Sequence, residues 1–137
     1  MTIKLGILAS GSGSNAQAMI DAVESGKLDA EICVIIANRP GAKVLERAAK
    51  HGIPHICIDH KTFPDRESFD LRMVEELQKA GVDTVALAGY MRLVTPAFLG
   101  AFPGRVLNIH PAILPSFPGT HGLYGSRLLS VAVGYRF

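Results

Sequence analysis

Short apolar runs alternate along the chain with segments whose apolar residues recur at helical spacing. The runs have the length and near-continuous hydrophobicity of strands covered on both faces, and they span 3–9, 32–37, 55–58, 82–88 and 105–109. Amphipathic stripes between the runs predict helices over 15–25, 42–50 and 65–80, and a short helical piece that begins at Thr95 and Pro96. Pro64 is expected in the first turn of the third helix.

This alternation of strands and helices predicts an α/β fold. Each strand–helix–strand unit is expected to cross over in the right-handed sense, which gives a doubly wound, mostly parallel sheet with helices on both faces. No internal repeat and no linker interrupts the pattern. In sheets of this kind, ligands bind beyond the carboxyl ends of the strands, so the residues that follow each apolar run are the first candidates for a site.

Composition narrows the functional class. The chain has 137 residues, 48% hydrophobic and 19% charged, which is typical of one globular domain. Its formal charge of +2 comes from 14 basic and 12 acidic residues without a run of like charge, so we expect neither a nucleic acid nor a membrane as partner. Cys33 and Cys57 show no disulfide or metal-type spacing, and the first apolar run is too short for a signal or membrane segment. A cytoplasmic protein without a bound metal is expected.

The stretch ASGSGSN follows the first predicted strand. Its glycines would let backbone N–H groups approach an anion, and the N-terminus of the next helix would add a favourable partial charge. The stretch lacks the third glycine of a dinucleotide fingerprint, and the second strand ends at Asn38 instead of an acidic residue. A phosphate site and a tight turn with a helix cap both remain open, and a nicotinamide site with Arg39 against a 2′-phosphate is a further alternative.

Two more stretches end strands at the same edge. In AGYMRLV, we expect Met91, Leu93 and Val94 to belong to the core more often than to a ligand wall. In RVLNIHP, Asn108 and His110 are two residues apart on a strand, so they share a face, and an amide and an imidazole can converge on one ligand atom. The alternative is that both side chains only bond to loop backbone.

Together, the GSGSN, GYMRLV and NIHPAILPSFPGTHG stretches resemble the phosphoribosylglycinamide formyltransferases, folate-dependent enzymes of purine biosynthesis. The resemblance runs from about residue 3 to 122 and includes the Asn-x-His-Pro signature of the folate formyltransferases. It implies transfer of a formyl group from 10-formyltetrahydrofolate, as cosubstrate, to the amine of 5-phosphoribosylglycinamide. Partners would be these small molecules alone.

The resemblance also implies roles for individual residues. It assigns the substrate phosphate to Gly13, Ser14 and Asn15, the catalytic positions to Asn108 and His110, and the side of the substrate amine to Gly89 and Pro111. It assigns folate contacts to Arg66, Met91, Arg92, Leu93, Val94 and Asn108. The apolar side chains of GYMRLV would then partly line a cleft.

The C-terminal part departs from the family's pattern. We expect a truncated formyltransferase domain over 1–122 and a divergent tail over 123–137, in which Val131, Val133 and Tyr135 alternate as in a strand. The family's Asp, which assists the catalytic His, has no match here, so slow transfer is expected, with a frameshift as the favoured origin of the tail. The competing hypothesis is a catalytically silent fragment that binds ribonucleotide phosphate.

Overall fold

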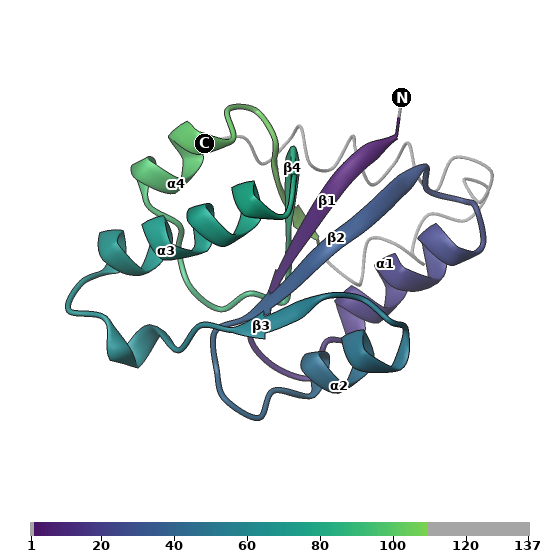
Figure 1. Cartoon of the computed structure of the whole chain (residues 1–137), viewed down its shortest axis with the longest axis horizontal. Helices are drawn as coiled ribbons and strands as arrows, with labels where there is room; N and C mark the ends of the chain where they lie inside the picture. The colour runs from purple at the N-terminus through teal and green to yellow at the C-terminus, as the bar shows by residue number, and fades with distance from the viewer. Residues whose placement is uncertain (1, 110–137) are drawn as a thin grey trace.

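The computed structural model of the chain describes residues 2–109, which form a parallel sheet with helices between its strands (Figure 1). In chain order the elements are β1 (Ile3–Ala9), α1 (Ser14–Glu24), β2 (Ala30–Ala37), α2 (Lys43–Lys50), β3 (His55–Cys57), the 3₁₀ turn η1 (His60–Thr62), α3 (Arg66–Lys79), β4 (Thr84–Ala88), α4 (Pro96–Ala101) and β5 (Val106–Ile109). This order confirms the predicted alternation of strands and helices.

The sheet is doubly wound. Its strand order is β3-β2-β1-β4-β5, and every pairing is parallel. The chain runs from β1 outward through β2 and β3, then returns to pair β4 with the other side of β1. The winding therefore reverses between β1 and β4, which is where an open α/β sheet of this kind binds its ligands.

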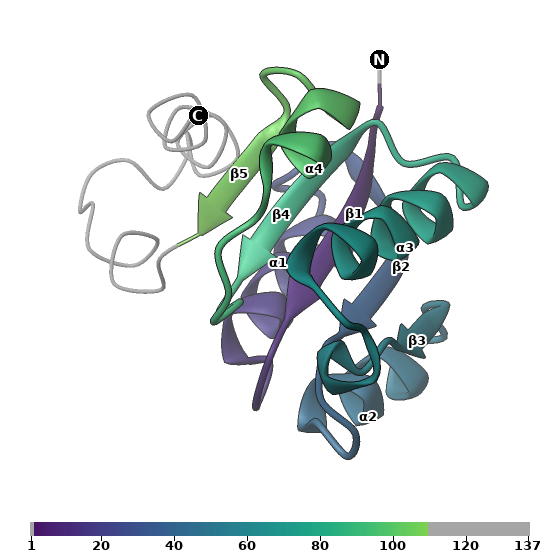
Figure 2. The same cartoon turned by 90° about the vertical axis from the view of Figure 1, so that its left-hand side faces the viewer.

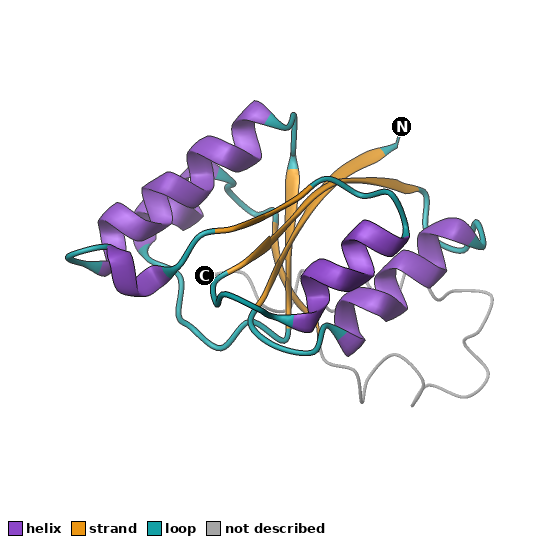
Figure 3. Cartoon of the chain, turned by 60° about the horizontal axis from the view of Figure 1, so that its bottom comes forward, coloured by secondary structure: helices purple, strands orange, loops and turns teal. Residues whose placement is uncertain are grey.

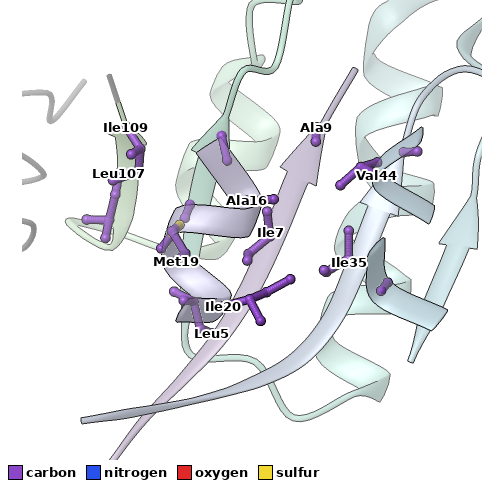
Figure 4. Close-up of a cluster of buried hydrophobic side chains, with 14 of the residues drawn as sticks. Leu5, Ile7, Ala9, Ala16, Met19, Ile20, Ile35, Val44, Leu107 and Ile109 are labelled. Atoms are coloured by element: carbon purple, nitrogen blue, oxygen red, sulfur yellow. The ribbon is translucent and has the colours of Figure 1, made fainter. Parts of the chain in front are cut away.

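Helices cover both faces of the sheet (Figures 2 and 3). On one face, α1 and α2 pack over β1, β2, β4 and β5 around Ile7, Met19 and Ile35 (Figure 4). On the other face, α3 and α4 pack around Leu8, Phe69 and Phe98. Successive residues of β1 thus enter opposite cores, which explains the near-continuous hydrophobicity of its sequence.

The starts of two helices are set by capping side chains. Asp65 accepts a hydrogen bond from the Ser68 backbone N–H at 2.7 Å, so α3 begins at Arg66. The expectation that Pro64 occupies the first turn is wrong, because the Asp65 cap stops the helix one residue short of it. Thr95 caps α4 through the Phe98 N–H at 3.4 Å, and Pro96 follows at the first helical position, as predicted.

The strand β5 ends the described sheet on the side of β4. Beside it lies an apolar cavity of about 460 Å³, lined by Pro96, Leu99, Gly100, Phe102, Pro103, Gly104 and Val106. The predicted domain boundary at residue 122, the tail over 123–137 and its alternating residues all lie outside the described residues.

Candidate active site

The carboxyl ends of β1, β2 and β4 enclose a cavity of about 270 Å³. Most of its lining comes from the turn between β1 and α1. The lining residues are Ser10, Gly11, Ser12, Gly13, Ser14, Asn15, Arg39, Ala88, Gly89 and Met91. The cavity therefore lies at the reversal point of the sheet, where the fold predicts a ligand.

Gly13 gives the turn its shape. Its φ is +80°, and a Cβ built on it would lie 2.7 Å from Val44 Cβ, so both the backbone conformation and the contact with α2 require glycine. Gly13 also occupies the N-cap position of α1, and within residues 2–109 no side-chain hydrogen bond caps the start of this helix. Free N–H groups and the helix dipole make this turn suited to an anion.

Asn15 joins the turn to two other strands. Its Nδ2 donates to the Ile109 carbonyl oxygen at 3.5 Å and would lie 3.6 Å from a Cβ at Gly89, which has a φ of +72°. The Asn15 side chain is buried, and its Oδ1 has no hydrogen-bond partner within residues 2–109. The side chain of Asn15 therefore lies close to the end of β4 and the end of β5 as well as in the glycine-rich turn.

Ser10 fixes the loop that follows β4. Its Oγ accepts a hydrogen bond from the Met91 backbone N–H at 2.9 Å, and the serine is only 1% exposed. This bond places Met91 on the cavity wall, opposite the glycine-rich turn.

Met91 and Leu93 are 75% and 73% exposed. The expectation from the residues alone that they belong to the core is wrong for these two, because the loop after β4 runs over the edge of the sheet and not beneath a helix. Val94 is half-buried and packs against the core between α3, α4 and the sheet. Large exposed apolar side chains beside a cavity are a feature of ligand walls.

Polar contacts beneath this wall hold the loop from its other side. The carboxylate of Asp70, 1% exposed on α3, accepts a hydrogen bond from the Thr95 N–H at 2.7 Å. The Arg92 guanidinium lies 5.5 Å from the centre of the Phe69 ring. Burial raises the pKa of the Tyr90 phenol, and the Asp70 charge raises it further, so Tyr90 stays neutral.

Two further predicted site residues, Arg66 and Asn108, do not line this cavity. Arg66 is exposed at the start of α3 and does not line it. Asn108 is half-buried on β5 opposite Leu87, and it alternates with Leu107 and Ile109 of the α1-side core, so it points to the face of α3 and α4. His110 and Pro111 lie outside the described residues.

Within residues 2–109, no three His, Cys, Asp or Glu side chains gather as metal ligands. Among the helices of that part, none is long and apolar enough to cross a membrane.

Sequence reasoning assigned no role to Asp70 and Ser10, which shape the site, and it considered Arg39 only against a 2′-phosphate. Asp70 stands next to Phe69 within the apolar stripe of α3. An acidic residue in such a stripe indicates a buried carboxylate that must have a hydrogen-bond partner. Ser10 directly follows the first apolar run, and residues in that position are the first candidates for a site, so the sequence pattern could have indicated it. Arg39 lines the cavity, but only the fold reveals that the end of β2 lies beside the turn after β1.

Comparison with known proteins adds an independent line of observation. The model of the "Formyl transferase" family matches residues 3–126. Phosphoribosylglycinamide formyltransferase of Escherichia coli is 41% identical over 115 residues, which cover 84% of this chain and 54% of that protein. A trifunctional purine biosynthetic protein of Drosophila pseudoobscura is 46% identical over 120 residues, which cover 86% of this chain and 9% of that protein.

Solved structures of related enzymes share the fold of this chain. Glycinamide ribonucleotide transformylase 1 of Symbiobacterium toebii superposes with a TM-score of 0.78 at 44% identity, over 92% of this chain and 59% of that one. The chain thus spans about half the length of the single-function relatives that it matches. From the family match, the sequence identity and the shared fold, we conclude that this chain belongs to the formyl transferase family.

Proposed function

We propose that this site transfers a formyl group from 10-formyltetrahydrofolate to the amine of 5-phosphoribosylglycinamide, a step of purine biosynthesis. The observation that carries the proposal is the bridge made by Asn15. Its side chain joins the anion-binding turn to the carbonyl of Ile109, which lies in sequence between Asn108 and His110. One substrate molecule can then have its phosphate in the turn and its reacting amine at the end of β5.

Gly13, Ser14 and Asn15 are proposed to bind the substrate phosphate. Support comes from the uncapped N-terminus of α1 and from the positive φ of Gly13, which together leave backbone N–H groups for an anion. Arg39 on the cavity wall supplies a positive charge at the same place. Gly89 and Pro111 are proposed to flank the substrate amine.

The formyl donor is proposed to bind along the loop after β4. The exposed side chains of Met91 and Leu93 offer apolar surface to the flat pterin ring, and Arg92 and Val94 complete this wall. Arg66 and Asn108 are proposed as polar folate contacts. The neutral Tyr90 and the buried Asp70 lie behind the wall and stiffen it.

The chemistry required is acyl transfer. The substrate amine attacks the formyl carbon, a new C–N bond forms, and negative charge develops on the formyl oxygen. The Asn108 amide and a protonated His110 are proposed to donate hydrogen bonds to this oxygen, a role worth on the order of a hundredfold in rate per donor. The bond from the formyl carbon to N10 then breaks, and His110 is the proposed donor of the proton that N10 takes up. The attacking nitrogen loses one proton in the same reaction, so in net terms one proton moves from the amine to N10.

Formyl transfer measured with both substrates tests the proposal. The chain should form the formylated product above background, and Asn108→Ala and His110→Ala should each lower the rate by about a hundredfold or more. Calorimetric titration with 5-phosphoribosylglycinamide should show that both variants still bind it. Equal, background rates for the chain and both variants would refute the transfer.

The second candidate function is binding of ribonucleotide phosphate without turnover. One observation favours it: among residues 2–109, the lining of this cavity lies between Ser10 and Met91 and does not include Asn108. Background transfer together with retained, saturable binding of 5-phosphoribosylglycinamide would select this function.

A further inference from the structure

Helix α2 is hydrogen-bonded to the proposed anion-binding turn, on the side of the turn away from β4. The Val44 backbone N–H donates to the Gly11 carbonyl oxygen at 3.3 Å, and Arg47 Nε donates to the Ser12 carbonyl oxygen at 2.7 Å. Two successive carbonyls of the turn are therefore drawn toward α2. Val44 also fills the space that a side chain at Gly13 would need.

These two carbonyl anchors fix the direction of two N–H groups. In a trans peptide unit, the carbonyl oxygen and the N–H of the next residue point to opposite sides, and no cis peptide is present among the described residues. Holding the Gly11 and Ser12 carbonyls against α2 thus turns the Ser12 and Gly13 N–H groups away from that helix. Ser12 and Gly13 line the cavity together with Gly89 and Met91.

A chain of side-chain hydrogen bonds holds Arg47 in place. Arg47 Nη1 donates to Gln17 Oε1 at 3.2 Å, and Gln17 Nε2 lies 3.2 Å from His51 Nε2. His51 Nδ1 in turn lies 2.9 Å from a carboxylate oxygen of Glu24. The guanidinium is therefore fixed between α1, α2 and the turn.

We propose that Arg47 is a positioning residue, which with Val44 makes α2 a clamp that aims the Ser12 and Gly13 N–H groups at the bound phosphate. This inference rests on the proposed function for the identity of the anion. The contacts themselves do not depend on it. Of the two anchors, only Arg47 can be tested by a side-chain substitution, because Val44 acts through its backbone.

Three variants separate positioning from charge and from general stability. Arg47→Met removes the guanidinium and keeps an unbranched apolar side chain. Arg47→Lys keeps the charge but offers no planar fork to span the Ser12 carbonyl and Gln17. Lys50→Met, an exposed residue on the same helix, removes one positive charge without touching the turn and serves as the matched control.

Two measurements on the full chain decide the proposal. In the free protein, backbone ¹⁵N order parameters of Ser12 and Gly13 should be about 0.85, and should fall below about 0.6 in Arg47→Met while staying unchanged in Lys50→Met. By calorimetry, affinity for ribose 5-phosphate should fall about tenfold in Arg47→Met and in Arg47→Lys, since each loses a charge-assisted hydrogen bond. Affinity for a reduced folate without phosphate should not change.

Unchanged order parameters in Arg47→Met would refute the proposal that Arg47 holds the turn, whatever ligand the chain binds. Full recovery of affinity in Arg47→Lys would overturn it as well, because charge alone would then suffice. If the unmodified chain does not bind ribose 5-phosphate, the proposed function fails, and the order parameters still decide whether Arg47 holds the turn.

Discussion

Three single residues determine the geometry of the proposed phosphate site. Gly13 permits the left-handed turn, Asn15 spans three strand ends, and Ser10 fixes the facing loop. Each was visible in the sequence as a glycine or a small polar residue after an apolar run. Gly13 and Asn15 were assigned a role from the family resemblance, whereas the bond of Ser10 to the Met91 N–H is seen only in the structure.

Replacing Gly13 by alanine tests the tight contact with α2. We expect the free energy of unfolding to fall by about 2–4 kcal/mol, from the positive φ and from the clash with Val44. Ribose 5-phosphate binding should be lost. Gly11→Ala is the control for stability, because a Cβ there meets nothing within 4 Å, and it should change stability by less than about 1 kcal/mol. Equal effects of the two substitutions in a urea titration would contradict the assigned contact.

Substitutions of Met91 and Leu93 test the proposed folate contacts. Because they are 75% and 73% exposed, alanine at either position should alter stability by less than about 0.5 kcal/mol. Affinity for a reduced folate should drop about tenfold, as expected for the loss of roughly 1.5 kcal/mol of apolar contact. Leu71→Ala, on an exposed apolar residue of α3, should leave folate affinity unchanged. A fluorescence titration in which all three variants bind alike would remove these residues from the site.

At the scale of elements, the hydrophobic pattern was sufficient to place every helix and strand of the described part within a few residues. Strand β1 has the predicted bounds, and β4 begins at Thr84, two residues later than its apolar run. Strand β2 begins at Ala30, two residues earlier than its apolar run. At the start of a helix, a single capping side chain can determine the boundary. Asp65, which caps α3, is the clearest case.

The Asp65 cap makes a testable contribution to α3, the helix that begins with Arg66. Hydrogen bonds from the Ser68 hydroxyl and backbone N–H hold the pKa of the Asp65 carboxyl below its ordinary value of 3.8. A depressed pKa stabilises the fold above that ordinary value, and the contribution is lost as the pH falls through the lowered pKa. Asp65→Ala should therefore lower Tm at pH 7, and the gap to the unmodified chain should close in acid.

Glu67→Ala removes the same charge from the same turn without removing a cap, so it is the matched control. Its Tm at pH 7 should lie above that of Asp65→Ala. Thermal melts in which both variants lose the same amount would show that charge near the helix start matters and the cap does not.

At the scale of the whole molecule, the site results from the winding of the sheet. The reversal between β1 and β4 brings the glycine-rich turn, Arg39 and the loop with Met91 to one edge. The sequence predicted the fold class and the edge, because both follow from the alternation of strands and helices. It could not predict that Arg39 lines the cavity, that the buried Asp70 carboxylate bonds to Thr95, or that α2 bonds to the turn after β1. Each of these contacts joins segments that are distant in the chain.

The central claim is that the cavity between β1 and β4 binds the phosphate of 5-phosphoribosylglycinamide. The most direct test is an NMR titration of the ¹⁵N-labelled chain with this ligand. The claim predicts that the backbone amide signals of Gly11, Gly13, Asn15 and Gly89 shift first and saturate together. Shifts confined to the neighbouring cavity at His60 and Lys61, or no saturable shift at all, would contradict it.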